Sequence, residues 1–457
     1  MGVKAVHPEY KKRQTQWKRV RDVLEGSDAV KAAGKTYLPM LGGQSVEEYT
    51  AYKDRALFYS AAGRSRDGLA GMLTRKLPQL DYPEEMASFF KDVSGNNTSF
   101  NELFTFTANE ELSVGRYGIL IDWPTNGGEP YLATYETESI INWFKDENDI
   151  LTGVVLQEDT LALASDGFTW EPVIQYRHLY IGADGKYHQQ LYNDKEKEVG
   201  TEITPVVRGS AIDIIPMAII TTSGMNQAPM KPPIMDIVDV NLSMYRTSAD
   251  LEHGRHFTAL PTPVIIGAPA DTVLKIGSQT AWAIPNEKAK VLYLEFMGQG
   301  LVSLERAMAE KTGQMAQFSS RLMDTSTRGS EAAETVRLRY SSEAATLSGI
   351  AVAVESAYNW LFNLVRQFKN IDGEVSIVLN KDFLNTRITA SDLREMTEAY
   401  ITGAMDKETY FYNLERGELV PEGKKTFDSE PVDLKSKDGI DERDLDRPTK
   451  EDEESKV

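Results

Sequence analysis

The chain has 457 residues, no cysteine, and 69 acidic against 50 basic residues, which gives a formal net charge of -19. The absence of cysteine excludes disulfides and thiolate metal sites, and the acidic excess argues against a protein that grips nucleic acid through a basic patch. The length predicts two to three domains. No apolar run of about 18 residues occurs, so no membrane-spanning helix is expected, and the N-terminus lacks the apolar core of a signal peptide.

The first 114 residues are predicted to be mainly helical. Residues 8–32 place lysines and arginines around an apolar stripe, which predicts a helix with a basic face. That face either contacts DNA or an acidic neighbour, or is solvated, and the solvated face is the favoured interpretation. Residues 45–73 are predicted to form a helix that begins with a capping box of Ser45 and Glu48. Two shorter helices are predicted, over 83–93 and 100–114.

The next hundred residues change to β-strand patterns. Apolar and aromatic runs bounded by turn residues predict six strands in a mixed α+β region. A hairpin turn is predicted at Gly182–Gly185. The predicted strands are 117–123, 131–135, 150–157, 173–181, 187–192 and 212–222.

Three apolar-periodic helices dominate the middle of the chain, over 234–257, 301–323 and 331–370. The first is apolar on two faces, which indicates several neighbours, other subunits among them. The second has a stripe that is interrupted at Lys311. The third would be roughly 60 Å long at about 1.5 Å per residue. Gly349 inside it costs on the order of 1 kcal/mol relative to alanine and predicts a kink.

Two connections between these helices stand out. Between the first and second helices, prolines 261, 263, 269 and 285 limit regular structure to short strands, the best being 264–266 and 291–294. Trp282 either anchors this small module or packs in a core. Between the second and third helices lies the polar loop 324–330, bracketed by Arg321 and Arg328.

The C-terminal part begins with a predicted strand at 375–379, which is expected to return to the sheet region. Two helices are predicted after it, ending near Gly403 and at Gly417. From Asp428 onward the chain is strongly charged and almost free of apolar residues, so a disordered tail is expected.

No catalytic constellation is found. The sequence has neither a Walker-type phosphate loop nor a Gly-x-Ser-x-Gly elbow. His253 and His256 lie three apart on a predicted helix without an identifiable third ligand, so they are interpreted as structural or surface histidines. The sequence therefore predicts no catalytic residue, no metal and no cofactor. An enzyme with an unrecognised site remains a third alternative to the two structural readings below.

Several stretches, taken in order and spacing, resemble the portal proteins of tailed bacteriophages. The resemblance covers roughly residues 7–420, and no one stretch is diagnostic alone. Residues 250–263 are similar to a junction between a stem helix and a clip, and Tyr293–Glu295 with Gly298 and Gly300 to the exit from that clip. The other similar stretches are 37–39, 52–56, 68–72 and 115–122.

The resemblance implies an α+β portal fold with a mixed α/β wing, two stem helices flanking a small β clip, a long kinked wing helix and a short helical crown. It divides the chain into N-terminal helices and wing (1–230), stem helix one (231–257), clip (258–297) and stem helix two (298–323). The remainder is the tunnel loop (324–330), long helix and return strand (331–385), crown (386–427) and acidic tail (428–457).

The resemblance also implies a function without catalysis. Portal subunits form a homo-oligomeric ring, about twelve by family resemblance, at one capsid vertex of the virion, and assemble in the host cytoplasm. Double-stranded DNA passes through the channel. The expected partners are the terminase large subunit, the major capsid and scaffold proteins, and head-completion or tail adaptor proteins, with no membrane partner. A shorter head-tail adaptor or neck protein is the alternative.

Two groups of residues are the implied sites. The tunnel loop, which would project into the channel and touch DNA, comprises Arg321, Met323, Asp324, Thr325, Ser326, Thr327 and Arg328. The clip, which would dock partners, includes Val264, Ile266 and Trp282. The loop could instead be a plain helix connection with solvated arginines. An acidic channel wall would repel the DNA backbone and so would not hold a moving duplex. Alternatively, the acidic charge only keeps the protein soluble.

Overall fold

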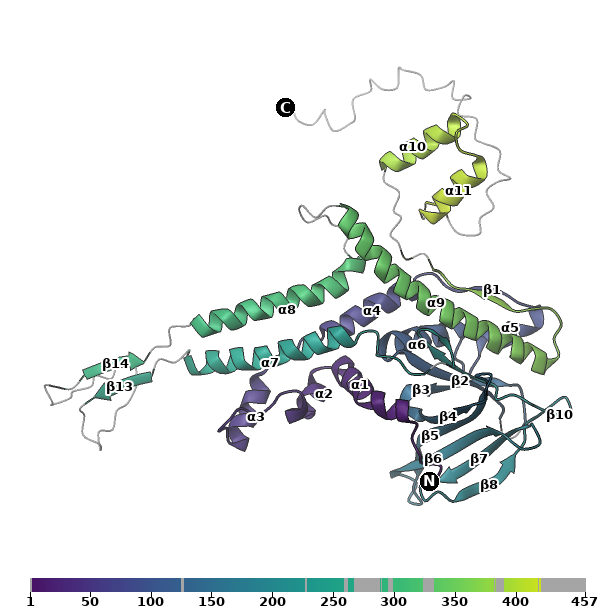
Figure 1. Cartoon of the computed structure of the whole chain (residues 1–457), viewed down its shortest axis with the longest axis horizontal. Helices are drawn as coiled ribbons and strands as arrows, with labels where there is room; N and C mark the ends of the chain where they lie inside the picture. The colour runs from purple at the N-terminus through teal and green to yellow at the C-terminus, as the bar shows by residue number, and fades with distance from the viewer. Residues whose placement is uncertain are drawn as a thin grey trace, which may run out of the picture. The chain divides into compact units, whose positions relative to one another are not determined.

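The computed structural model describes residues 2–124, 127–226, 228–258, 262–266, 288, 290–294, 299–323, 333–381, 383, 390–417 and 419–420. The chain divides into two compact units, Met1–Leu384 and Asn385–Val457. Helices and several sheets are both present, which confirms the predicted mixed α+β class (Figure 1). Across these described ranges, no helix has the length and apolar character needed to span a membrane.

The first unit begins with helices α1 (Pro8–Glu25), α2 (Ser27–Ala32), α3 (Val46–Arg55) and α4 (Ala61–Thr74). The predicted helix over 8–32 is broken at Gly26, whose φ of 114° lies in a region that favours glycine. The predicted capping box is confirmed: the Ser45 amide donates to Glu48 Oε2 at 2.8 Å, and the Glu48 amide donates to Ser45 Oγ at 3.2 Å.

The prediction of one helix over 45–73 is wrong, because residues 56–60 leave the helical path. Two buried polar side chains of α7 (Met235–Thr258) bond the irregular backbone there. Ser248 Oγ donates to the Leu57 carbonyl at 2.7 Å and accepts from its amide at 2.9 Å. The Asn241 side chain likewise accepts from the Ala62 amide at 3.0 Å and donates to the Tyr59 carbonyl at 2.8 Å. These bonds replace those that a continuous helix would make.

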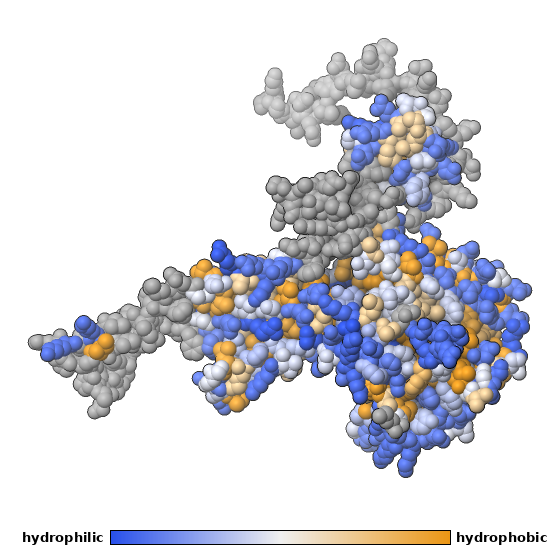
Figure 2. Space-filling model, viewed as in Figure 1, coloured by the Kyte–Doolittle hydropathy of each residue, from blue (hydrophilic) through white to orange (hydrophobic). Residues whose placement is uncertain are grey.

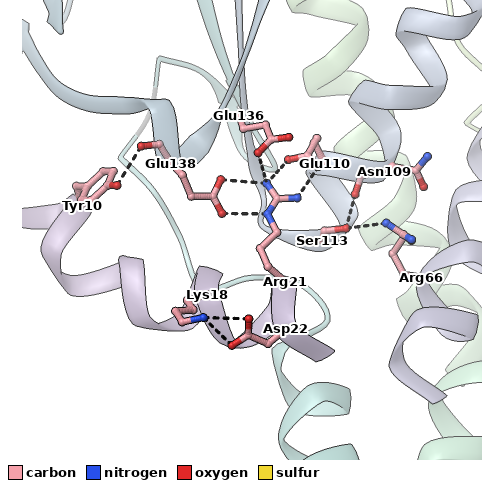
Figure 3. A network of polar contacts seen from close by, with 10 residues as sticks. All are labelled: Tyr10, Lys18, Arg21, Asp22, Arg66, Asn109, Glu110, Ser113, Glu136 and Glu138. Carbon is pink, nitrogen blue, oxygen red and sulfur yellow. Dashed lines mark hydrogen bonds and ion pairs between the residues drawn. The ribbon is translucent and has the colours of Figure 1, made fainter. Parts of the chain in front are cut away.

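The basic face of α1 is only partly solvated. Arg21 donates to both carboxylate oxygens of Glu110 at 2.7 and 2.6 Å and to those of Glu138 at 3.0 Å. Glu136 lies 3.8 Å away, and Figure 3 shows the three acidic side chains around the guanidinium. An acidic neighbour within the chain therefore takes up part of the basic face, while Lys11 and Lys12 are exposed.

A four-stranded sheet forms the centre of the first unit, in the order β12-β11-β2-β3. Every residue of β2 is buried. Its alternating side chains enter two cores: Ile119 and Ile121 pack with the helices, and Leu120 packs with a second sheet. The bounds are β2 Arg116–Asp122, β3 Tyr131–Glu136, β11 Met217–Thr221 and β12 Gly224–Met225.

The second sheet is a five-stranded antiparallel meander in the order β4-β5-β6-β7-β8. Its outer strands β4 (Ile140–Lys145) and β8 (Glu198–Ile203) were not predicted from the sequence. The inner strands are β5 Leu151–Leu163, β6 Trp170–Ile181 and β7 Tyr187–Asn193. Two-residue strands β9 (Val206–Val207) and β10 (Ser210–Ala211) form a small pair.

Helices cover the other side of the central sheet. The long helix α9 (Ala333–Lys369) passes Gly349 as one continuous helix. Its buried Tyr358 and Phe362 meet Phe100 of α6 edge-to-face, with ring centroids 5.0 and 5.1 Å apart. The remaining helical elements are η1 Gly34–Thr36, η2 Glu84–Met86, α5 Ala87–Lys91, α6 Phe100–Ser113 and η3 Thr137–Ser139.

The strand expected near 375–379 is present as β15 (Ser376–Val378), but its predicted partner is wrong. It pairs with β1 (Gln79–Asp81) as a separate two-stranded sheet. Asn359 and Asn363 of α9 hold this segment, since each side chain both donates to and accepts from its backbone, at 2.7–3.1 Å. The strand therefore returns to the helix α9 and to β1 rather than to the larger sheets.

The second unit contains α10 (Ala390–Ile401) and α11 (Lys407–Arg416). Asp406 caps α11 by accepting from the Thr409 amide at 2.8 Å. The rings of Tyr400 and Tyr410 stack, 4.8 Å apart, and join the two helices. Both predicted helices are thus present, and the predicted tail from Asp428 lies outside the described residues.

Candidate functional site

The most distinctive feature of the first unit is a pair of long helices that extends from the α/β body and has a β-hairpin at its far end. The helices are α7 and α8 (Gln299–Met323), and the hairpin strands are β13 (Thr262–Ile266) and β14 (Lys290–Leu294). Figure 1 shows α7 and α8 side by side with the hairpin beyond them. We call α7, α8 and the hairpin the projection.

The chain's own N-terminal helices pack against α7 from its start as far as His253. The buried Ile234, just before α7, and Val238, Leu242 and Tyr245 within it join a core with α1 and α3, which covers one of the two predicted apolar faces. The Tyr52 hydroxyl donates to Asp250 at 2.6 Å, and its ring meets His253 edge-on at 5.2 Å. Burial, with the nearby Arg55, lowers the pKa of His253. His253 is thus a packed structural histidine, as the sequence indicates.

From Thr247 to the hairpin end of α7, the helices α7 and α8 approach closely. A Cβ placed on Gly254 would lie 2.6 Å from Leu301 Cδ2, so a larger residue would push the helices apart. Arg255 donates to Glu305 across the pair at 2.9 Å. Lys311 interrupts the apolar stripe because its ammonium donates to the Thr247 hydroxyl of α7. Burial, together with Arg246, lowers the pKa of Lys311.

The outward face of α8 is polar and carries both signs of charge. The predicted stripe residues Leu301, Leu304 and Met308 are only half-buried, because α7 covers them from one side. In Figure 2 hydrophilic and apolar residues are mixed along the visible face of this helix pair. The exposed side chains of α8 between 300 and 315 include Val302, Ser303, Glu305, Arg306, Glu310, Thr312 and Gln314.

The hairpin contains two of the three predicted clip residues. Its strands pair antiparallel from Thr262↔Leu294 to Ile266↔Lys290, with Val264 opposite Leu292. Ile266 is 55% exposed. Trp282 lies outside the described residues.

The predicted tunnel-loop residues fall at the other end of α8. The backbone of Arg321 and Met323 forms the last turn of the helix, and α9 begins at Ala333. Asp324, Thr325, Ser326, Thr327 and Arg328 lie outside the described residues. The structure therefore brings Arg321 and Met323 together at the end of α8.

Sequence reasoning missed the residues that set the geometry of the projection. Asn241, Ser248 and Gly254 are polar or small residues inside an apolar helix, and that is the signal that could have drawn attention to them. The sequence gives no indication that the partners of Asn241 and Ser248 lie about 180–190 residues earlier in the chain. Within the described residues, no cluster of three or more His, Cys, Asp or Glu could hold a metal ion.

Comparison with known proteins gives one family match within this region. A family described as "Domain of unknown function (DUF4055)" matches residues 233–369, which span α7, the hairpin, α8 and α9. None of the curated proteins compared with the chain matches it.

Among solved structures, the chain is similar to a protein in "Neck of empty GTA particle computed with C6 symmetry", with 13% identity, a TM-score of 0.42, and coverage of 77% of this chain and 89% of that chain. A chain in "Virion of native gene transfer agent (GTA) particle" gives 13% identity and a TM-score of 0.41, covering 84% and 98%. The HK97 family phage portal protein from Corynebacterium diphtheriae gives 11% identity and a TM-score of 0.31, covering 70% and 92%. At these values the likeness assigns no function to the chain.

Proposed function

We propose that the chain is a phage portal protein, whose subunits form a ring of about twelve at one capsid vertex. The observation that carries this proposal is the projection: two antiparallel helices with a β-hairpin at their far end, followed by a long helix that returns across the body. This is the order of stem, clip, stem, tunnel loop and wing helix that the sequence resemblance implies.

The half-covered stripe of α8 supports assembly into a ring. A solvated two-helix pair leaves Leu301, Leu304 and Met308 partly exposed to water, and burial of such apolar surface favours association. A neighbouring projection in a ring would cover them. Head-to-tail repetition of one interface around an axis closes into such a ring.

The proposed role of the ring is a DNA passage and a docking surface. α7 and α8 would line the channel, and their mixed charges, in a chain of net charge -19, would hold a moving duplex only weakly. The hairpin with Val264 and Ile266 would meet the terminase large subunit during filling and head-completion or tail adaptor proteins afterwards. The body would contact the major capsid and scaffold proteins in the virion, after assembly in the host cytoplasm.

The alternative is another head-tail adaptor or neck protein. Such a protein would also form a ring around DNA, but it would have no need for a helix-hairpin-helix projection of this length. We also propose that the chain is not an enzyme, so purified protein should show neither nuclease nor ATPase activity.

The test is the mass and shape of the purified full-length protein, measured by light scattering after size exclusion and by negative-stain imaging. A ring of about twelve subunits with an axial hole supports the proposal. Where the protein is monomeric, the measurement is repeated at high concentration with scaffold protein present. A compact dimer that persists under those conditions would overturn the proposal.

A further inference from the structure

The antiparallel hairpin of β5 and β6 extends beyond the sheet to which it belongs. The two strands pair continuously up to Leu163↔Trp170. The neighbouring strand β4 pairs with β5 only as far as Leu156, and β7 pairs with β6 only from Gln175. Residues 158–174 therefore form a two-stranded ribbon with no neighbouring strand in the sheet. We call this ribbon the arm.

The turn at the end of the arm is well defined. The Ala164 amide donates to the Thr169 carbonyl at 2.7 Å, and the Gly167 amide donates to the Ala164 carbonyl at 3.0 Å. The Asp166 carboxylate accepts from the Thr169 hydroxyl and, at 2.9 Å, from the amides of Thr169 and Phe168, and these bonds lower its pKa to about 2. The turn is thus organised by its own hydrogen bonds. Binding a partner would therefore cost little conformational entropy in the arm.

One face of the arm is apolar and exposed. Residues that pair across antiparallel strands share a face, so Leu161 with Pro172 and Leu163 with Trp170 form an apolar ladder. Leu161 is 65% exposed, Trp170 is 61% exposed, and Phe168 in the turn is 89% exposed. Large apolar side chains gathered on one exposed face mark an interaction surface rather than the single residues normal on protein surfaces.

The charge of the arm identifies the kind of partner. Between residues 158 and 174 the sequence has Glu158, Asp159, Asp166 and Glu171 but no lysine or arginine. Glu158 is taken up within the chain by Arg177, at 2.8 Å. Asp159 lies on the face of the ladder, Asp166 in the turn and Glu171 on the opposite face of the arm. The complementary surface is therefore apolar with positive charge beside it.

The chain itself carries such a surface. Residues 55–66, from the end of α3 into the start of α4, contain Arg55, Arg64 and Arg66 and no acidic residue. Arg64 is exposed, whereas Arg66 pairs with Asp67 at 2.7 Å. Leu57 is 63% exposed and Tyr59 is 49% exposed, and the Arg64 guanidinium lies 4.6 Å from the Tyr59 ring centroid. Residues 2–76 as a whole hold 15 basic and 8 acidic residues in a chain that is otherwise acidic.

The two surfaces lie on different parts of the first unit. Figure 1 shows α3 beside α7, whereas β5 and β6 belong to the sheet on the other side of α1. Two different complementary surfaces on one chain generate a head-to-tail contact between copies, and such a contact closes into a ring when the rotation permits. We infer that the arm of one subunit docks on residues 55–66 of the neighbouring subunit. The inference rests on the proposed ring and adds the surfaces that hold it together.

The test compares assembly of the full-length protein with that of variants at both surfaces, by sedimentation velocity over a range of protein concentrations. Trp170→Ser with Leu163→Ser, and separately Leu57→Ser with Tyr59→Ser, should each raise the concentration needed for assembly about tenfold or more, because aromatic anchors dominate such contacts. Leu77→Ser is the matched control, since Leu77 is also 65% exposed but lies on neither surface. Thermal melting checks that each variant is folded.

A charge exchange makes the test specific. Asp159→Arg and Arg64→Asp should each weaken assembly, and the double variant should regain it. Assembly of the arm variants at the wild-type concentration overturns the inference, as does weakening by the arm variants without weakening by those at 55–66. If the wild-type protein does not assemble at all, it is the proposed ring that fails, so the two failures are distinguishable.

Discussion

At the residue scale, the most unusual environment is that of Glu111 and Arg116, which are both fully buried. Arg116 lies over the Trp143 ring, 4.2 Å from its centroid, and donates to the Ile140 carbonyl at 3.4 Å. Among the described residues, none donates a hydrogen bond to either carboxylate oxygen of Glu111. Burial, assisted by Glu110 and opposed by Arg116, raises the pKa of Glu111 to about 8. Burial lowers the pKa of Arg116 to about 9.

The raised pKa of Glu111 makes stability depend on pH. An unfolded glutamate loses its proton near pH 4.5, whereas the folded one holds it to about pH 8. The folded state therefore binds more protons in this window, and its stability falls as the pH rises. Glu111→Gln should remove this dependence, giving a variant that is of the order of 1–3 kcal/mol more stable than wild type above pH 8 and similar at pH 5. Urea unfolding at both pH values measures the difference in stability. If the free energy of unfolding of the variant changes with pH as that of wild type does, the raised pKa of Glu111 is contradicted.

Substitution of the neighbouring Glu110 should lower stability, whereas substitution of Glu111 raises it. Burial alone would lower the pKa of Arg21, but its hydrogen bonds with Glu110 and Glu138 raise it above the usual value. Glu110→Gln leaves the partly buried guanidinium with less compensation, so we expect a loss of about 1–2 kcal/mol of stability at pH 7. The same unfolding experiment provides the measurement. A variant as stable as wild type would show that Arg21 is adequately solvated without this partner.

At the element scale, periodicity predicts the long helices well and their interruptions poorly. The pattern of Leu301, Leu304 and Met308 indicates α8, and the start of α3 follows from Ser45 and Glu48 alone. The break after α3 depends on Ser248 and Asn241, which are distant in sequence, so no local pattern contains it. The unpredicted strands β4 and β8 are outer strands, each paired on one side only, where patterning is weakest.

The anchoring of α7 is testable through Ser248. Its hydroxyl bonds both the amide and the carbonyl of Leu57, and the side chain is only 2% exposed. Ser248→Ala leaves two backbone groups without their partner and should cost about 1–3 kcal/mol. Ser243→Ala, on the same helix, is the control and should cost well under 1 kcal/mol, because substitutions away from such bonds have small effects. Equal stability of the two variants, measured by urea unfolding, would argue against this anchor.

At the scale of the whole molecule, the sequence resemblance supplies what periodicity cannot. Alternating helices and strands indicate a mixed α+β chain, but they do not indicate that α7 and α8 leave the body together with a hairpin at their end. The candidate DNA-contact residues depend still more on that resemblance, since only Arg321 and Met323 of them lie within the described helix.

The segment between α8 and α9 gives the last prediction, which follows from the proposed function. If Asp324–Arg328 act by contacting DNA in the channel, assembly of the ring should not depend on their side chains. Replacing these five residues with glycine and serine, at unchanged length, should leave the mass and shape of the ring as in wild type. DNA packaged or retained per particle should fall, and Arg328→Gln alone should give a smaller loss, because one phosphate contact is removed.

Light scattering and quantification of nuclease-protected DNA measure the two effects separately. Normal genome filling in the replaced variant would sink the assignment of these residues to DNA contact, whereas loss of the ring would show that the segment acts in assembly.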